Sequence, residues 1–572
     1  MKRIIRGAVQ VAAFTLCINA QAAQRSAAEA QKLAQEILHS DSVSLAGPSA
    51  MNAAAMRGED GTLANEEITP YFIYNNEKGA GFVLVSGSDR MRPVIGYSDS
   101  GTIDAENLPT NMQAWLQSVS EATAWAEAHQ EVALANGTAD GIVVTPLLNG
   151  IAWGQEYPFN SLCPKKNEQI SVTGCVATAG AQVVFYHRYP EQGIGSHTNA
   201  NDTTQKINFS EQSYDYSKMF KSYSIRRIYQ SAQLLAVAQL SYHCGVMADM
   251  EYSPEGSGTV TQCLRRGLVE NFGYDPYAEV VNRENFTYDE WTALLNNELQ
   301  EKRPVIYGGA ANDGQDGHCF VIDGVDEDGL YHVNWGWYGD CDGYYDITIL
   351  NPESDGVTEY EDGFCTGQEA LIQVAPKGTL ANAQYYSPIS SSGALTISTS
   401  SVALGGKASF KLTEFYNQSV TPLVFKLGLA FVQEGKVVTN SDATSAYSGT
   451  IKLTLDPYYG YGEYSNIRAT VPTTLADGTY RVYACAVPVS GDHKNEVGLI
   501  RCLASGTSFY TCTVANQRAT FAKGIVSAIE MISANGTASA DATYDLYGHR
   551  IGSLANAPAG IYVVGGKKVK KP

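Results

Sequence analysis

The first 150 residues predict a small α+β unit that precedes the rest of the chain. Apolar residues recur at helical spacing in residues 26–38 and again in residues 111–130. Between these segments, residues 71–88 contain two apolar runs on either side of a turn-forming stretch, which predicts a β-hairpin. The polar residues 135–141 are typical of a linker, so we expect a domain boundary close to them.

From residue 144 to about residue 376, helical patterns come first and strand patterns later. Helices are predicted directly after Cys175, at residues 229–244, after Gly258 and at residues 288–302. Strands dominate from Pro304 onward. This order predicts an α+β fold with a helical lobe beside an antiparallel β lobe, and a cleft between two lobes is the usual place for chemistry.

The pattern changes again beyond Asn382, where short alternating strands are separated by Gly, Asn and Asp. Residues 382–518 therefore predict an all-β sandwich of the immunoglobulin-like kind, without an obvious catalytic cluster. Residues 525–572 form a short β-like tail that ends in the basic string "KKVKKP".

The N-terminus predicts export. Lys2, Arg3 and Arg6 precede an apolar run from about residue 8 to residue 18, and the small-x-small pattern at residues 20–22 is typical of a signal peptidase site. We therefore expect residues 1–22 to be a signal peptide and the mature protein to be secreted, extracellular or at the cell surface. No later segment approaches 18 apolar residues, so no membrane span is expected.

Composition narrows the classes of function. The 572 residues imply several domains, and 44% hydrophobic and 17% charged residues describe ordinary globular protein. The net charge of −20 argues against a nucleic-acid partner. The 11 cysteines lack C-x-x-C spacing and no H-E-x-x-H string occurs, so neither a zinc site nor a cofactor is expected.

Cys175 is the first candidate for chemistry, because it lies where a loop becomes an alanine-rich helix that ends before Pro190. Unpaired N–H groups and the helix dipole at such a position lower the pKa of a thiol and favour the thiolate. The alternative is a small buried residue that packs a helix start.

His318 is the histidine best placed to act as the base for this thiol. It lies in an apolar run that the turn at residues 325–329 joins to a second run, and strand pairing about that turn joins positions whose numbers sum to about 653. His318 and Asn334 sum to 652, so we expect the asparagine carbonyl to accept from the ring N–H and to fix the imidazole tautomer. Trp335 would shield this bond from water.

Alternatives remain for each of these residues. Considered by itself, His318 could be an ordinary strand histidine that makes its hydrogen bonds within the hairpin. His332 is the rival base, and we expect it to pair near Val321, away from any asparagine. Gln155 is a candidate donor to the oxyanion that develops in acyl transfer, and its alternative is an ordinary loop glutamine.

Three strings, "TGCVATAGAQVVFYHRYP", "GHCFVIDG" and "HVNWGWYGDCDGYYDI", resemble the streptopain family of the papain clan. The resemblance covers roughly residues 50–376. The chain order of the four polar candidates fits it, as does the spacing of 143 residues (318 − 175) between the cysteine and the histidine. Cys319 is a departure, because many relatives have alanine at this position, and the many further cysteines are another.

The resemblance implies a papain-like, two-lobed cysteine endopeptidase domain at residues 144–376. Carried over by position, the implied roles are nucleophile for Cys175, base for His318, orienter for Asn334, shield for Trp335 and oxyanion donor for Gln155. The resemblance also implies an inhibitory α+β prodomain at residues 23–143, a hydrophobic second subsite, and residues 242–259 as a cleft-lining segment. Protein or peptide substrates and the chain's own prodomain are the implied partners.

Two other functions stay open on the sequence. One is an exported β-rich adhesin with a structural thiol, and the other is a papain-like acyl transferase, which passes the acyl group to an amine instead of water. The tail at residues 525–572 resembles the sorting tails of secreted bacterial proteins, which makes outer-membrane secretion machinery a further expected partner.

Overall fold

A computed structural model describes most of the chain between residues 24 and 523. The described ranges are 24–47, 69–128, 142–286, 288–310, 317–347, 368–433, 435–438, 447–501 and 509–523, with four short strands after residue 542. The predicted signal peptide, the linker at residues 135–141 and most of the tail lie outside these ranges. None of the described helices is long and apolar enough to cross a membrane.

The N-terminal segment, residues 24–128, contains the two predicted helices and the predicted hairpin. Ser26 caps the first helix by a reciprocal capping box with Glu29, which satisfies N–H groups at the helix start. The hairpin pairs Tyr71 with Ser86 and Asn75 with Phe82, as the alternation predicted. Its elements are α1 (Ala27–Ile37), β1 (Val43–Gly47), β2 (Tyr71–Asn76), β3 (Phe82–Ser86), β4 (Val94–Ser98) and α2 (Thr110–Ala128).

The central segment, residues 142–376, has its helices before the strands that begin at Val305, as predicted, while five short strands lie before and among the helices. Its helices are α3 (Cys175–His187), α4 (Ser231–Met247), α5 (Thr261–Phe272) and α6 (Tyr288–Gln300), with short 3-10 turns at Phe209–Glu211, Tyr216–Lys218 and Arg283–Asn285. Its strands are β5 (Lys165–Lys166), β6 (Gln169–Ile170), β7 (Ser196–Thr198), β8 (Lys206–Asn208), β9 (Glu279–Asn282), β10 (Val305–Ala310), β11 (Gly317–Val325), β12 (Tyr331–Asn334), β13 (Gly343–Tyr345) and β14 (Glu369–Ile372).

One antiparallel sheet runs through both segments, in the order β1-β2-β3-β4-β13-β12-β11-β10-β14-β9. The seam is the pairing of β4 with β13, where Tyr97 faces Tyr344 and Gly96 faces Tyr345. The N-terminal segment therefore shares its sheet with the central segment, which the sequence did not suggest. Local periodicity reveals that a segment is a strand, but it does not reveal which distant strand completes the ladder.

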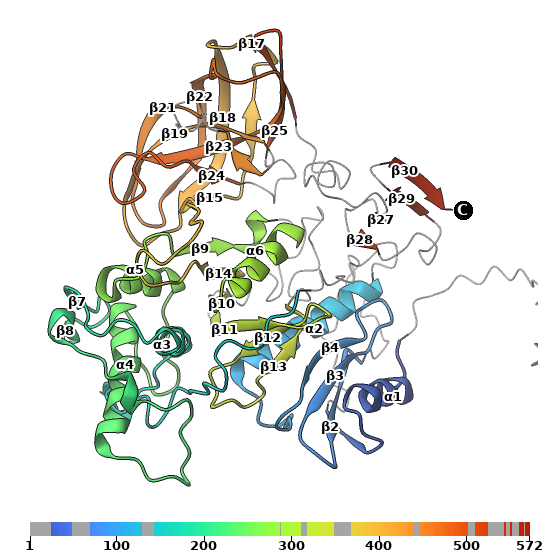
Figure 1. Cartoon of the computed structure of the whole chain (residues 1–572), viewed down its shortest axis with the longest axis vertical. Coiled ribbons are helices and arrows are strands. Elements are labelled where there is room, and N and C mark those ends of the chain that lie inside the picture. The colour runs from blue at the N-terminus through green and yellow to red at the C-terminus, as the bar shows by residue number, and fades with distance from the viewer. Residues whose placement is uncertain are drawn as a thin grey trace, which may run out of the picture.

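The two faces of this sheet carry different cores. Cys319 and Val321 of β11 belong to the core formed with α3, α4 and α5, whereas Phe320 and Ile322 belong to the core formed with α2 and α6. This alternation follows from the two-residue period of a strand. Figure 1 shows the result, with α3, α4 and α5 on one side of β10–β13 and the N-terminal segment on the other side.

The C-terminal segment, residues 382–523, is all β. A four-stranded and an eight-stranded sheet share one apolar core. The strands are β15 (Ile389–Ser391), β16 (Leu395–Ile397), β17 (Ser401–Ala403), β18 (Lys407–Asn417), β19 (Leu423–Gln433), β20 (Lys436–Val437), β21 (Tyr447–Leu455), β22 (Gly460–Thr470), β23 (Gly478–Pro488), β24 (Gly498–Ile500), β25 (Tyr510–Ala515) and β26 (Arg518–Lys523). Beyond them lie β27 (Thr543–Tyr544), β28 (Arg550–Ile551), β29 (Gly560–Val564) and β30 (Lys567–Lys571).

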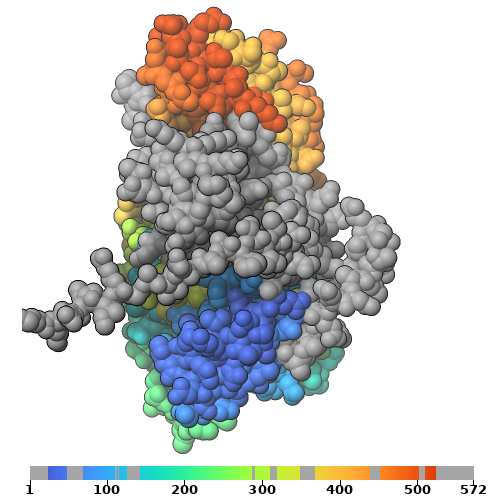
Figure 2. All heavy atoms as spheres, turned by 90° about the vertical axis from the view of Figure 1, so that its right-hand side faces the viewer, coloured from blue at the N-terminus to red at the C-terminus, as the bar shows by residue number. Residues whose placement is uncertain are grey.

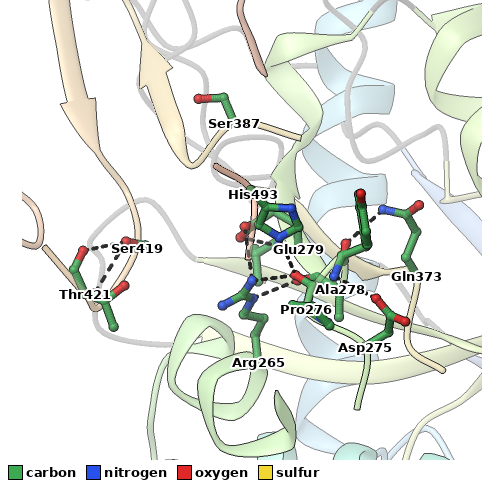
Figure 3. A network of polar contacts seen from close by, with 12 residues as sticks. Arg265, Asp275, Pro276, Ala278, Glu279, Gln373, Ser387, Ser419, Thr421 and His493 are labelled. Carbon is green, nitrogen blue, oxygen red and sulfur yellow. Dashed lines mark hydrogen bonds and ion pairs between the residues drawn. The ribbon is translucent and has the colours of Figure 1, made fainter. Parts of the chain in front are cut away.

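Polar contacts join the C-terminal segment to the β9 end of the central sheet (Figure 3). His493 hydrogen-bonds the carbonyl oxygen of Pro276 at 2.9 Å, and the Gln418 amide donates to the carbonyl oxygen of Val280 at 3.0 Å. The Arg501 guanidinium contacts both carboxylate oxygens of Glu290 at 2.7 and 2.8 Å. Figure 2 shows the consequence for the whole molecule, with the C-terminal segment at one end and the N-terminal segment toward the other.

Candidate active site

Cys175 is the first residue of α3, at the loop-to-helix transition that the sequence predicted. The preceding Gly174 has φ +86°, and a Cβ at that position would lie 2.7 Å from the Met250 sulfur and 2.8 Å from the Ser257 carbonyl oxygen. Only glycine fits such a backbone conformation and such close neighbours. Gly174 therefore fixes where the chain enters the helix, and with it the position of Cys175.

The loop before Cys175 is attached to two other candidate segments. The Thr173 N–H donates to the Gln155 carbonyl oxygen at 2.9 Å. Gln155 therefore lies beside Thr173, which precedes Cys175 by two residues in the chain. Val172 donates its N–H to the Ser253 carbonyl oxygen at 3.2 Å and accepts from the Ser257 hydroxyl at 2.7 Å. The segment expected to line the cleft, residues 242–259, thus packs beside the candidate nucleophile.

The Cys175 sulfur lies against backbone N–H groups. Those of Cys175 and Val176 come from the start of α3, and a third comes from Cys319 on β11, and all three favour the thiolate. Burial acts in the opposite direction and is the larger effect, so the pKa of the Cys175 thiol is raised above its ordinary value. The expectation of a lowered pKa was wrong for the full-length chain, because it considered the helix start and left out the surroundings.

His318 lies on β11, directly before the residue whose N–H reaches the Cys175 sulfur. It is half-buried and faces Gly309 of β10. Strand alternation groups His318 with Phe320, whereas Cys319 projects toward α3. The structure therefore brings the strand of the expected base to the nucleophile through the Cys319 N–H, and in the full-length chain strand alternation directs the Cys319 side chain, not that of His318, toward α3.

Asn334 ends β12 and does not face His318 in the ladder. Its strand partner is Val321, so paired positions sum to 655 instead of the expected 653. The Asp326 carboxylate accepts from the N–H groups of Asp328 and Leu330, which extends the turn toward Leu330 and moves its centre. The predicted register was therefore wrong by about one residue on each strand.

The Asn334 side chain instead takes part in a buried network that the sequence did not suggest. Its amide oxygen accepts from the Gln182 amide at 2.9 Å and from the Gly336 N–H at 3.1 Å, and its amide nitrogen donates to the Ile151 carbonyl oxygen at 2.7 Å. The Gln182 amide oxygen accepts from the Trp153 N–H at 3.2 Å. Gln182 thus connects the Cys175 helix, the Gln155 loop and the end of β12.

Gln182 was missed although the sequence carries a signal for it. It is fully buried between Ala181 and Val183, in a helix whose other buried residues are nearly all apolar. A glutamine at such a position requires hydrogen-bond partners inside the protein. The isolated amide in an alanine- and valine-rich helix was the feature that could have identified it.

Trp335 is buried beneath β11. Its ring packs against Phe320 at a centroid distance of 5.0 Å and against Tyr345 at 5.3 Å, and its indole N–H donates to the Cys341 carbonyl oxygen at 3.1 Å. Trp335 was expected to shield a bond between His318 and Asn334, but these contacts are with Phe320, Tyr345 and Cys341. Trp335 instead supports the strand that carries His318 and Cys319.

Gln155 lies in a loop that Tyr338 holds in place. The Tyr338 hydroxyl accepts from the Glu156 N–H at 2.9 Å, and the Tyr338 N–H donates to the Trp153 carbonyl oxygen at 3.0 Å. A Cβ on Gly154 would lie 2.4 Å from the Tyr338 ring, so this loop packs directly on the tyrosine. Gln155 is therefore on a fixed backbone next to the loop that precedes Cys175.

His332, the rival base, is bound to a buried carboxylate. It faces Gly324, not Val321 as expected, and its Nδ1 lies 2.6 Å from Oδ1 of the fully buried Asp323. This hydrogen bond and the charge of Asp323 raise the pKa of His332 despite its burial.

Asp342 is a second buried carboxyl close to His332, and burial raises its pKa to about 7. Within the described residues, no group of three or more His, Cys, Asp or Glu side chains could hold a metal ion.

Comparisons with known proteins agree with the sequence resemblance. The family model of the peptidase C10 family matches residues 153–345, and that of the Spi protease inhibitor matches residues 22–123. Streptopain of Streptococcus pyogenes is 34% identical over 331 residues, which is 53% of this chain and 80% of streptopain. The thiol protease/hemagglutinin PrtT of Porphyromonas gingivalis is 32% identical over 340 residues, which is 55% of this chain and 38% of that protein.

Solved structures of interpain A from Prevotella intermedia are also similar. A prointerpain A fragment is 35% identical and aligns over 55% of this chain and 98% of the fragment, with a TM-score of 0.48. Active interpain A is 40% identical and aligns over 41% of this chain and 96% of its own, with a TM-score of 0.37. On the family match and the streptopain alignment, the chain is a cysteine endopeptidase that belongs to the streptopain family, peptidase C10.

Proposed function

We propose that the chain is a secreted zymogen that hydrolyses peptide bonds of extracellular proteins, with Cys175 as the nucleophile and His318 as the base. The observation that carries the proposal is the contact between the Cys175 sulfur, at the start of α3, and the backbone N–H next to His318 on β11. A helix start that stabilises an anion and a histidine strand beside it are the components of a cysteine peptidase site.

The proposed reaction uses groups of this chain in named roles. The Cys175 thiolate attacks the carbonyl carbon of the peptide bond, and the N–H of Cys175 with the Gln155 side-chain amide stabilises the oxyanion. His318 takes the thiol proton and gives it to the leaving amine, after which water releases the acyl group. Asn334 and Trp335 act as positioning groups for the β11–β12 region, because their contacts are with Gln182, Ile151, Gly336 and Phe320.

The N-terminal segment acts as the inhibitory prodomain in this proposal, and residues 144–376 as a papain-like two-lobed peptidase domain. The N-terminal segment matches the Spi protease inhibitor model and contributes strands to the central sheet, and both observations support the prodomain role. The raised pKa of the Cys175 thiol in the full-length chain also fits an inactive form, since a protonated thiol is a poor nucleophile.

Maturation is proposed to cut the chain between residues 133 and 143. Residues up to 148 follow the linker directly, but Val144 exchanges two backbone hydrogen bonds with Val325, of 2.8 and 2.9 Å, and the Leu147 N–H donates to the Asp323 carbonyl oxygen. Hydrogen-bonded backbone resists proteolysis, so the cut falls before Val144. The sorting-type tail, residues 525–572, is proposed to serve export or surface retention by outer-membrane secretion machinery.

Incubating purified wild type and the Cys175→Ala variant side by side tests the function. Wild type should lose about 12–14 kDa, at about 110 Da per residue from residue 23, and then digest casein. The Cys175→Ala variant should stay intact and lose activity by at least ~10³-fold, as should His318→Ala, whereas Asn334→Ala should lose less.

His332→Ala is the matched control, because it removes a neighbouring histidine that is bound to Asp323. Equal loss in His332→Ala and His318→Ala, with both proteins folded, would refute the assignment of the base. Product masses separate the remaining alternative, since an acyl transferase adds the mass of an amine where a hydrolase adds water.

A further inference from the structure

Cys319 is a second thiol in the immediate surroundings of the candidate nucleophile. It is buried on β11 with an exposed fraction of 3%, and its N–H hydrogen-bonds the Cys175 sulfur. The Cys319 nitrogen is one bond, about 1.46 Å, from its own Cα. The Cys175 sulfur therefore already lies against the backbone atoms that carry the second thiol.

The two side chains also lie against the same hydrophobic core. Cys319 belongs to the core on the α3 face of the sheet, and Cys175 packs against that same core. Burial and the charge that Cys175 can carry raise the pKa of Cys319, which fits this placement of the two residues. Opposite Cys319 in the ladder is Gly308, which has no side chain to separate them.

Simple packing does not require a thiol here, because alanine would also fill a small buried position with less reactivity. The eight cysteines that the structure describes are all free thiols, so neither Cys175 nor Cys319 is already paired. Apart from Cys175 itself, Cys319 is the described cysteine whose backbone N–H contacts the Cys175 sulfur. Cys244, by comparison, lies in the middle of the same core on α4.

We propose that Cys319 is a resolving cysteine, which forms a reversible disulfide with Cys175 when peroxide oxidises the nucleophile. The proposal deepens the proposed function, since it takes Cys175 as the reactive thiol. A disulfide requires Cα atoms about 4.4–6.8 Å apart, and the contact between the Cys319 N–H and the Cys175 sulfur brings the two residues together as such a bond needs.

The chemistry balances with hydrogen peroxide as the oxidant. The Cys175 thiolate attacks one peroxide oxygen, so an S–O bond forms, the O–O bond breaks and hydroxide leaves as water after protonation. The Cys319 thiolate then attacks the sulfur of the Cys175 sulfenic acid, forming the S–S bond and expelling a second hydroxide as water. Both thiols are oxidised by one electron each, and the peroxide accepts the two electrons.

The disulfide protects the nucleophile from permanent damage. A sulfenic acid without a nearby thiol is oxidised further to sulfinic acid, which thiols do not reduce. Burial and the charge of Cys175 hold the pKa of Cys319 well above its ordinary value, so its thiolate is scarce. Proximity compensates, because attack within the protein is unimolecular and does not depend on an encounter in solution. Two thiol groups of an external reductant, such as dithiothreitol, reduce the disulfide and restore the enzyme.

Wild type, Cys319→Ala and the matched control Cys244→Ala should be treated, as full-length chains and after maturation, with graded hydrogen peroxide and then with dithiothreitol. Non-reducing peptide mapping of oxidised wild type should give a linked pair of peptides that contain Cys175 and Cys319, about 2 Da lighter than the sum of the reduced peptides. In Cys319→Ala, the Cys175 peptide should gain about 32 Da, the mass of a sulfinic acid.

Activity after dithiothreitol gives the second readout. Wild type and Cys244→Ala should regain most of their activity, whereas the regain of Cys319→Ala should be smaller by roughly tenfold, because sulfinic acid is not reduced by thiols. Absence of the linked peptides in oxidised wild type would overturn the proposal, as would equal regain in wild type and Cys319→Ala. The mapping needs no peptidase activity, so failure of the proposed function would be visible separately as an inactive protein that still forms the pair.

Discussion

Gln182 connects three parts of the candidate site through one buried amide. Replacing it by glutamate gives a side chain of nearly the same size whose charge depends on pH. Gln182→Glu keeps an acceptor for the Trp153 N–H but, when ionised, presents an oxygen to the Asn334 amide oxygen. We expect kcat to fall by roughly 10- to 100-fold at neutral pH with little change in KM, because misplacement by about 1 Å has such effects. Part of the loss should reverse at lower pH, where the protonated carboxyl can donate to Asn334.

Gln373→Glu is the matched control, since Gln373 is also buried and donates its amide to carbonyl oxygens, at Tyr277 and Gln384. It should change the thermal midpoint without changing the shape of the pH profile of kcat. A Gln182→Glu enzyme with the wild-type pH profile would show that the Gln182 amide does not position the site.

Asp342 predicts a pH dependence of stability. Its pKa is raised from an ordinary value of 3.8 to about 7 by burial, so between these values the folded protein binds more protons than the unfolded chain. The stabilisation is fully present below about pH 4 and is lost as pH rises through about 7, at up to about 1.4 kcal/mol per pH unit. Asp342→Asn keeps an oxygen for the Trp335 N–H and should flatten this dependence.

Urea midpoints of the tryptophan fluorescence transition, measured from pH 4 to pH 8 in a Cys175→Ala background, check this prediction. The background variant prevents self-digestion during unfolding. If the urea midpoint of Asp342→Asn depended on pH as steeply as that of the background variant, another group would titrate in this range.

At the scale of single residues, the sequence located the site better than it described the contacts. Cys175 at a helix start followed from the alanine-rich pattern and Pro190, and the structure agrees. The partner of Asn334 could not be predicted, because it depends on the centre of a turn that the Asp326 side chain determines. The state of the thiol could not be predicted either, because burial is a property of the assembled fold.

At the scale of elements, the β4–β13 seam offers a specific way to loosen the N-terminal segment. A Cβ on Gly96 would lie 2.6 Å from the Tyr345 ring, so Gly96→Val overpacks the seam. Overpacking costs about 1–3 kcal/mol, which corresponds to roughly a 5- to 150-fold weaker association. We expect the uncut Gly96→Val protein to show peptidase activity that uncut wild type lacks, because its N-terminal segment detaches more often.

Initial rates with a small peptide substrate, read before any cleavage is visible on a gel, test this expectation. Gly79→Ala is the control, since its Cβ would meet only the Asn76 side chain in the β2–β3 turn. If uncut Gly96→Val and Gly79→Ala have the same rate while both are folded, the seam does not contribute to inhibition.

Most elements could be predicted from the sequence, whereas their long-range pairing could not. The helices α1 to α6 and the β2–β3 hairpin follow local periodicity. The seam joins Tyr97 to Tyr344, stacked at 5.3 Å, and the Tyr97 hydroxyl donates to Asp326. Nothing in either segment alone indicates the other, because a strand's free edge accepts any complementary strand.

At the scale of the whole molecule, the C-terminal tail is expected to be separable from catalysis. Residues 525–572 contain no candidate catalytic residue, and the β-sandwich lies between them and the central segment in the chain. Deleting them should leave kcat/KM of the purified enzyme unchanged and should shift protein from the cell surface to the medium. Immunoblots of both fractions and peptide hydrolysis rates measure the two effects, and an inactive but folded truncation would contradict the prediction.

The continuous sheet also has a consequence for how the protein is made. Tyr97 cannot meet Tyr344 until 247 further residues (344 − 97) have been synthesised, and β14, which separates β10 from β9, ends only at Ile372. Contacts between such distant positions slow folding, because a long loop must close before the contacts stabilise it. The growing chain therefore stays without its complete sheet until about residue 372 has emerged, and without the Cys319 N–H that contacts the Cys175 sulfur until β11 has emerged. We therefore expect no self-digestion of the nascent chain before β11 has been synthesised.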